Sequence, residues 1–236
     1  MPDRIIEIEG LSYSYPDGTR ALSGVNLEVF KGDCLGIIGP NGAGKTTLLL
    51  HLNGLLKGNG KVNVCGLKVQ EKNLHLIRSK VGLIFQDPDI QLFMPTLFED
   101  VAFGPLNMGL SKGDILNSVN CALETVDMLK YKEKLAHHLS LGEKKRASIA
   151  TVLSMNPEIL VMDEPTGNLD PKHRRSLIEF INKLKLTKII ATHDLKLVFE
   201  ICQRVVIIDR GAVCANGVTV DIFNDKDLLR AHGLEL

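Results

Sequence analysis

The chain has 236 residues and a mass of 25.9 kDa, enough for one large domain with a substantial buried core. Hydrophobic residues make up 44% and charged residues 24%, which excludes a disordered chain, collagen and a coiled coil. The 28 basic and 28 acidic side chains cancel, so the basic excess typical of proteins that bind nucleic acid is missing and we expect no such partner.

The cysteines and the N-terminal segment indicate an intracellular protein. The five cysteines are odd in number and contain no CxxC pair, which argues against a disulfide framework or a zinc site. The first ten residues carry acids where a signal peptide has a basic and then an apolar region. No apolar run approaches the roughly 18 residues that a membrane span requires.

In chain order, the first elements are short strands. Apolar stretches at 5–15 and 25–30 flank a Pro-Asp-Gly turn and predict an antiparallel pair. The run CLGIIG at 34–39 is continuously apolar, as in a strand buried on both faces. A helix follows from Leu48, and further strands are expected at 62–65 and 81–85.

From residue 88 to about 155 the spacing of apolar residues is helical, with Ser111 and Asp114 as a plausible N-terminal cap. Beyond Asn156-Pro157, strands and helices alternate, which predicts parallel strands with crossover helices. The segment from Thr219 reads as one short amphipathic helix packed on the core.

These elements predict a single α/β domain with a mostly parallel sheet and flanking helices. The α/β core would comprise residues 1–87 and 156–220, with an antiparallel β element at its front. A helical subdomain would occupy 88–155, and residues 221–236 would form a C-terminal tail.

A glycine-rich loop matches the pattern GxxxxGK[ST] between a predicted strand and a predicted helix. Its backbone N–H groups and the following helix N-terminus suit phosphate oxygens, its lysine suits the β- and γ-phosphates, and its threonine hydroxyl suits Mg²⁺. The loop is therefore predicted to bind a nucleotide through Gly39, Pro40, Asn41, Gly42, Ala43, Gly44, Lys45, Thr46 and Thr47.

Two acids and a histidine follow apolar strands further along. The strand ILVMD delivers Asp163 and then Glu164 to the edge where α/β sheets bind ligands. Asp163 is a candidate Mg²⁺ ligand through Thr46 or water, and Glu164 a candidate base for an attacking water. His193 closes the strand KIIATH, where it could meet the γ-phosphate or orient that water. A strand ending in charged or capping residues is the simpler alternative for each.

Taken with further segments, the chain resembles the ATP-hydrolysing subunit of ABC transporters over residues 1 to about 225. Gln86 follows the strand VGLIF like the family's Q-loop glutamine, LSLGEKKR (139–146) lies where the family's signature lies, and GNLD ends in Asp170 like its D-loop. The resemblance implies a P-loop fold with a β and a helical subdomain, a catalytic Glu164, and a switch histidine at His193.

The resemblance also implies further site residues. Adenine would stack on Tyr15, with Tyr13 as the other candidate, and Mg²⁺ would be held by Thr46, Gln86 and Asp163. Two subunits would sandwich two ATP molecules, each signature acting on the ATP of the other subunit through Ser140, Gly142 and Glu143, with Asp170 at the dimer contact. Ser140 and Glu143 form a capping-box pattern, so a well-capped surface helix is the simpler alternative.

The signature departs from the usual LSGGQ at two positions. Leu141 replaces a glycine, and Glu143 replaces a glutamine and adds a negative charge near phosphate. Both a homodimer and a heterodimer with a related ATPase therefore stay open.

Two stretches, YPDGTRAL and QDPDIQLFMPTLFEDVAFGPLNMGL, resemble the ATPases of cobalt/nickel and energy-coupling-factor importers. That resemblance implies an integral membrane partner, a metal ion or a vitamin as cargo, and a place on the cytoplasmic face of the cell membrane. Apolar residues crowd the segment 87–110, which suits either a docking groove or core packing.

Two other classes remain as alternatives. A non-transport ABC protein of DNA repair, chromosome structure or translation usually carries coiled coils, zinc modules or a second ATPase half, and none is evident here. A P-loop GTPase needs a guanine-reading segment such as NKxD, which this sequence lacks, and a phosphate-acceptor assay would test a kinase.

Overall fold

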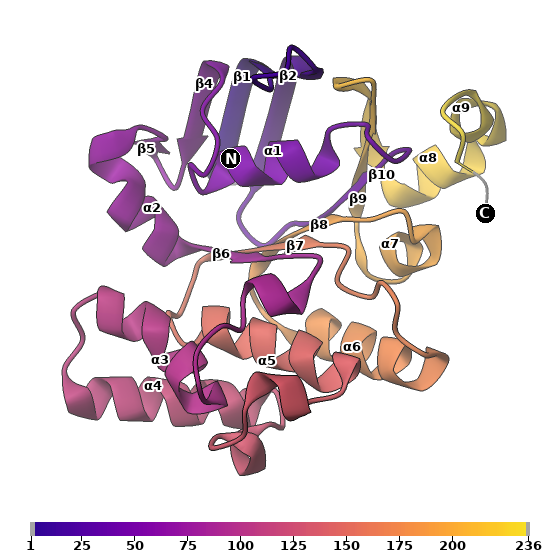
Figure 1. Cartoon of the computed structure of the whole chain (residues 1–236). Helices are drawn as coiled ribbons and strands as arrows, with labels where there is room; N and C mark the ends of the chain where they lie inside the picture. Colours follow the sequence, from indigo (N-terminus) through magenta and orange to yellow (C-terminus); the bar gives the residue numbers. More distant parts are fainter. Residues whose placement is uncertain (1–2, 235–236) are drawn as a thin grey trace.

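The computed structural model describes residues 3–234, so the two residues at each end of the chain, which the predicted core and tail include, lie outside it. Two sheets and the helices around them make up the fold (Figure 1). The larger sheet has six strands in the order β10-β9-β3-β8-β7-β6, and all of its neighbouring pairs are parallel except β9 and β10. Its strands are β3 (Cys34–Ile38), β6 (Val81–Ile84), β7 (Ile159–Asp163), β8 (Thr187–Ala191), β9 (Arg204–Asp209) and β10 (Ala212–Val218).

The smaller sheet is antiparallel and has the order β2-β1-β4-β5. Its strands are β1 (Arg4–Ser14), β2 (Arg20–Phe30), β4 (Asn59–Val64) and β5 (Leu67–Lys68). Helix α1 (Lys45–Leu52) lies between the two sheets in Figure 1, and α2 (Leu74–Lys80) leads from the smaller sheet into β6.

The remaining helices lie on the other face of the larger sheet and beyond its edge (Figure 1). They are α3 (Leu97–Asn107), α4 (Lys112–Thr125), α5 (Leu141–Leu153), α6 (Pro171–Lys183), α7 (Leu195–Ile201), α8 (Thr219–Asn224) and α9 (Lys226–Ala231). Short 3-10 turns at Leu129–Tyr131 and Ala136–His138 lie between α4 and α5, and another at Pro88–Ile90 lies between β6 and α3.

Alternate residues of the central strands enter two different cores. In β7, Val161 packs toward α1 and the smaller sheet, whereas Leu160 and Met162 pack toward helices α3–α7. In β3, Ile37 and Ile38 divide between the two cores in the same way. Because both faces of the strands are covered, the apolar runs are continuous, as the sequence pattern predicts.

Several predicted boundaries are corrected by local chemistry. Helix α6 begins before the predicted Leu177, because the Asp170 carboxylate accepts hydrogen bonds from the N–H groups of Lys172 and His173 and Pro171 suits the first helical turn. Helix α1 starts directly after the glycine-rich loop. Strand β10 was not predicted, and the expected single C-terminal helix is two short helices, the second capped by Asp225. The predicted Ser111 cap of α4 is confirmed.

None of the helices within residues 3–234 combines the length and the hydropathy that a membrane-spanning helix requires.

Candidate functional site

The strand order brings three chemically distinct loops to one edge of the larger sheet. Strands β3 and β7 both pair with β8, so the carboxyl ends of all three lie side by side. The glycine-rich loop follows β3, Glu164 follows β7, and Thr192 and His193 follow β8. Residues that are more than 100 positions apart in the sequence therefore meet at the ligand-binding edge of a parallel sheet.

The glycine-rich loop wraps closely against the smaller sheet. Gly44 has a φ of +102°, and a Cβ there would lie 2.5 Å from the main-chain oxygen of Ala21 in β2. Only glycine fits this position, because both the backbone conformation and the space exclude a side chain. The hairpin between β1 and β2 is thereby held at the side of the phosphate loop.

A cavity of about 500 Å³ opens where these segments meet. It holds the loop from Asn41 onward together with most of the predicted site residues. The lining residues are Tyr15, Thr19, Arg20, Ala21, Asn41, Gly42, Ala43, Gly44, Lys45, Thr46, Thr47, Gln86, Asp163, Glu164 and His193. The predicted Gly39 and Pro40 do not line it; their carbonyl oxygens accept hydrogen bonds from Lys45 Nζ at 2.7 and 3.0 Å.

Lys45 is buried at the base of this cavity and is 7% exposed. Burial lowers the pKa of its amine, while the nearby carboxylates of Glu164 and Asp163 act in the opposite direction. A phosphate group beside Lys45 would add negative charge and stabilise the protonated form.

Thr46 and Asp163 form the pair expected of a divalent-cation site. Thr46 Oγ1 donates to Asp163 Oδ2 at 2.7 Å. Burial raises the pKa of Asp163, and the hydrogen bond from Thr46 partly opposes that rise. Within residues 3–234 no group of three or more His, Cys, Asp and Glu side chains is arranged so that it could hold a metal ion by itself. The donor set of one hydroxyl, one carboxylate and the neighbouring Gln86 amide fits Mg²⁺, which keeps several waters and takes phosphate oxygens as ligands.

Glu164 is held tightly. Its Oε2 accepts from Thr192 Oγ1 at 2.8 Å, and its Oε1 lies 2.9 Å from the His193 N–H and 2.8 Å from His193 Nδ1. The Glu164 side chain is 9% exposed, whereas that of His193 is 68% exposed. One ring nitrogen of His193 therefore contacts the Glu164 carboxylate, while most of the histidine side chain is exposed.

Of the two candidate tyrosines, Tyr15 lines the cavity and Tyr13 does not. The Tyr15 hydroxyl bonds to Thr47 Oγ1 at 2.9 Å, and its ring meets that of Tyr13 edge to face. Tyr13 in turn packs against His51. The geometry favours Tyr15 for stacking.

The signature residues do not reach this cavity. Ser140 is the N-cap of α5 and forms the expected capping box with Glu143, whose carboxylate accepts from the Ser140 N–H at 2.8 Å. That backbone hydrogen bond lowers the pKa of Glu143, so the extra negative charge is stabilised within its own helix. Leu141 is 37% exposed.

The start of α6 lies next to the predicted signature. A Cβ at Gly142 would lie 3.0 Å from Cδ2 of His173 in α6, and the His173 ring bonds to the Asp170 carboxylate. Asp170 is exposed, and its pKa is lowered by the hydrogen bonds with His173. His173 thus lies between the exposed Asp170 and Gly142.

Some residues at the site were not predicted from the sequence. Thr19, Arg20 and Ala21 line the cavity because β2 begins at Arg20, immediately after the predicted turn. The only available signal was their place within the YPDGTRAL segment. Lys145 also lies close to the site, with its Nζ 3.2 Å from the main-chain oxygen of Glu164.

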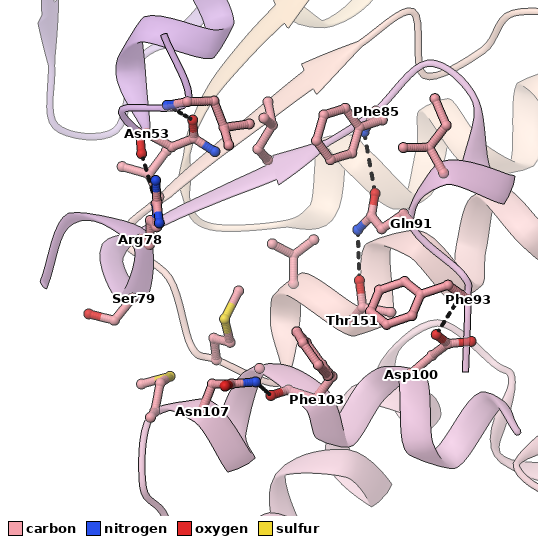
Figure 2. A pocket seen from close by; sticks show the side chains of 18 of the residues that line it. Asn53, Arg78, Ser79, Phe85, Gln91, Phe93, Asp100, Phe103, Asn107 and Thr151 are labelled. Atoms are coloured by element: carbon pink, nitrogen blue, oxygen red, sulfur yellow. Dashed lines mark hydrogen bonds between the residues drawn. The ribbon is translucent and has the colours of Figure 1, made fainter. Parts of the chain in front are cut away.

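A second cavity, the apolar groove, is lined on one side by residues from the segment 85–93, which is named the Gln86 segment (Figure 2). It has a volume of about 580 Å³. Its wall includes Phe85, Ile90, Phe93 and Phe103, and Ile90 and Phe93 are 64% and 60% exposed. Leu92, Leu97 and Val101 of the same segment are buried. This segment therefore supplies both core residues and an exposed apolar wall.

A family model described as "ABC transporter" matches residues 22–167. The energy-coupling factor transporter ATP-binding protein EcfA of Methanothermobacter thermautotrophicus is 47% identical over 98% of this chain and 76% of its own length. The structure of CbiO1 from Clostridium perfringens, titled as part of the ABC transporter complex cbiONQ, is 38% identical with a TM-score of 0.85, covering 99% of this chain and 96% of that one.

A dimeric structure titled MJ0796, a bacterial ABC transporter cassette, is 26% identical with a TM-score of 0.82, covering 91% of this chain and 99% of that one. These likenesses confirm the predicted fold class and the predicted ATPase activity, since the ATP-binding domain of this family hydrolyses ATP. The chain belongs to the ABC transporter family, as an ATP-binding, ATP-hydrolysing subunit.

Proposed function

We propose that this subunit is the motor of an importer that couples ATP hydrolysis to uptake of a transition-metal ion, cobalt or nickel, through an integral membrane partner. The observation that carries the proposal is the apolar groove, which is lined by four large exposed apolar side chains with no segment from residues 3–234 lying over them: Leu55, Ile90, Phe93 and Phe103. The 38% identical CbiO1, whose title places it in a cbiONQ complex, supports it.

We assign the residue roles as follows. Lys45 and the glycine-rich loop bind the phosphates, Tyr15 stacks on adenine, and Glu164 accepts a proton from the attacking water while His193 orients Glu164. Mg²⁺ would be held by Thr46, Asp163 and Gln86, and when bound it would offset the negative charge of the phosphates. The hydrogen bonds of Glu164 support its role, because they fix its carboxylate at the cavity wall.

We also propose that the working unit is a dimer and that residues 88–155 act as a helical subdomain carrying the signature. The free N–H groups at the start of α5 have a partial positive charge, and Ser140 is exposed there. Neither Ser140 nor Gly142 lines the ATP cavity of its own chain. A second subunit would bring its own ATP to this surface, in a homodimer or with a related ATPase.

The occupant proposed for the groove is a helix of the membrane partner, which would place this subunit at the cytoplasmic face of the cell membrane. The groove wall is mostly apolar and contains one buried acid, Asp100. Asp100 Oδ1 accepts from the N–H groups of Phe93 and Met94, each at 2.9 Å, whereas its Oδ2 is buried with no hydrogen-bond partner among the described residues. A helix with apolar side chains and one donor would complement this wall.

Co-purification tests the proposal. The chain would be co-expressed with the membrane subunit of a cobalt or nickel importer and purified in detergent, and radioactive Co²⁺ and Ni²⁺ uptake would be measured in proteoliposomes. Phe103→Glu places a charge in the groove and should abolish co-purification while ATP binding persists. Leu116→Glu on α4 is the matched control, because Leu116 is 47% exposed and lies outside the groove, against 43% for Phe103.

The alternative cargo is a vitamin, through an energy-coupling-factor importer, and the 47% identity to EcfA favours it. Vitamin uptake with an energy-coupling-factor membrane subunit, and no metal uptake, would decide for that alternative. A chain that stays free of every membrane subunit while hydrolysing ATP would contradict both and leave a non-transport ABC ATPase.

A further inference from the structure

A buried lysine on the signature helix contacts two parts of the ATP site at once. Lys145 lies in the second turn of α5, and it is 3% exposed. Its Nζ donates to the main-chain oxygen of Gln86 at 2.6 Å and to that of Glu164 at 3.2 Å. One ammonium group therefore joins the signature helix, the Gln86 segment and the end of β7.

Burying this lysine costs more free energy than burying an apolar side chain of similar size would. Burial lowers the pKa of Lys145, and the negative charges of Glu164 and Asp163 counteract only part of this decrease. Both acceptors are main-chain carbonyls, so no carboxylate neutralises the ammonium through a direct hydrogen bond. An apolar side chain could occupy the same position with no charge to desolvate, which points to a role beyond packing.

The contact with Glu164 falls on a strained residue. Glu164 has a φ of +44°, a left-handed conformation that costs a non-glycine residue of the order of 1 kcal/mol or more. Its N–H donates to the Ala191 oxygen at 2.8 Å, and its carbonyl accepts from the Gly167 N–H at 3.1 Å as well as from Lys145. Such a conformation persists only where its surroundings over-determine it, and Lys145 supplies the single charged donor.

The contact with Gln86 belongs to a larger attachment. Lys144 Nζ bonds to Asp89 Oδ1 at 2.6 Å. Gln91 Nε2 donates to the Ser148 oxygen at 2.9 Å and to Thr151 Oγ1 at 2.7 Å, as Figure 2 shows for Thr151. Two turns of α5 are thus fastened to the segment that forms one wall of the groove, and Lys145 links this unit to Glu164.

We propose that Lys145 is a positioning residue for hydrolysis, which holds the main chain of Glu164 so that its carboxylate faces the attacking water only when α5 and the Gln86 segment are in place. The inference rests on the proposed role of Glu164. Lys145 does not line the ATP cavity, so its removal should lower kcat and leave ATP binding intact.

The test uses Lys145→Met, which keeps the length of the chain and removes the donor. We expect kcat to fall about 10- to 100-fold, the scale of a misplaced catalytic group, with KM for MgATP within about threefold. Lys145→Arg, which retains a cation, should recover part of the rate. Lys183→Met is the control, since it removes the same charge from an exposed position near the end of α6, and its kcat should stay within about twofold of the parent.

A double variant separates positioning from general stability. In the background of Glu164→Gln, Lys145→Met should cause no further loss in the residual rate, because residues that act as a unit are not additive. Independent multiplication of the two losses, an unchanged kcat in Lys145→Met, or a loss of binding to a fluorescent ATP analogue would each overturn the inference. If Lys145→Met does not fold, Lys145→Arg and Lys145→Gln decide it by the same criteria. An unchanged rate in Glu164→Gln itself would instead contradict the role of Glu164.

Discussion

At the residue scale, the contact between Glu164 and His193 bears on the role that we propose for His193. The imidazole lines the ATP cavity, and its Nδ1 lies 2.8 Å from the Glu164 carboxylate. Its contribution should therefore be to the geometry of the base and less to the affinity for ATP.

His193→Ala is expected to lower kcat by about 10²-fold and to change KM for MgATP by less than about threefold. Phosphate release at saturating MgATP measures kcat, and a titration of MgATP measures KM. The reverse result, a raised KM at unchanged kcat, would assign His193 to nucleotide binding.

The reactivity of the Cys65 thiol should depend on pH. Burial, together with the charge of Glu158, raises the pKa of this thiol from 9.0 to about 11. At pH 8 its thiolate fraction should be small, so iodoacetamide should modify the exposed Cys121 and Cys214 first. Peptide mass spectrometry over time checks the order, and early labelling of Cys65 would contradict it.

The raised pKa of Cys65 also makes the free energy of unfolding depend on pH. Between pH 9.0 and about 11 the unfolded thiol has lost its proton while the folded one keeps it. The contribution of Cys65 to the free energy of unfolding is therefore fully present below pH 9.0 and is lost as the pH rises through about 11.

At the scale of the elements, helices α3 and α5 both begin with a capping box. Thr96 Oγ1 accepts from the Glu99 N–H at 3.2 Å, and the Glu99 carboxylate accepts from the Thr96 N–H at 2.9 Å. The matching box at Ser140 and Glu143 starts the signature helix. In each case two N–H groups that lack helical partners are satisfied.

Thr96→Ala should reduce the free energy of unfolding by about 1 kcal/mol, the usual effect of losing an N-cap. Urea unfolding followed by circular dichroism measures it. Thr125→Ala at the C-terminal end of the neighbouring helix α4 is the comparison, because that hydroxyl bonds to the Cys121 carbonyl of its own helix, and its effect should stay within about 0.5 kcal/mol. Equal losses in both variants would show that the cap is not responsible.

The sequence predicted those features that depend on local pattern. The GxxxxGK[ST] loop, the buried strands and the Ser140 capping box follow from spacing and residue type, and the structure has them as expected. What a pattern cannot show is which distant side chain fills a given space. Lys145 is one of three consecutive basic residues in the sequence, and only the packing of α5 against β6 and the residues that follow β6 and β7 reveals that it is buried.

The same limit applies to the cavity wall. Thr19, Arg20 and Ala21 reach the ATP cavity because the Gly44 loop packs against β2, a contact between segments that the sequence separates. The split of the segment 87–110 into core and groove likewise depends on how α3 rests on α5, which neither composition nor periodicity contains.

At the scale of the whole molecule, Ser140 lies outside the ATP cavity of its own chain, so we expect two chains to associate when ATP is bound. Glu164→Gln should bind ATP without turning it over, and light scattering after gel filtration should then give about twice the 25.9 kDa of the chain. Without ATP the mass should be that of one chain. A monomer that binds ATP would indicate that a related ATPase or the membrane subunit completes the site.

The place of β3 in the larger sheet also has a consequence for synthesis. Both neighbours of β3 come late in the chain, since Cys34 pairs with Lys188 of β8 and Leu35 with Arg204 of β9. At about 5–20 residues per second, the ribosome needs roughly 8 to 30 s to make the intervening 150 or so residues. During that time an apolar strand and the loop that will hold phosphate have no partner strands. Nascent chains shorter than residue 187 should therefore aggregate or recruit a chaperone, and release from it should coincide with the emergence of β8 and β9.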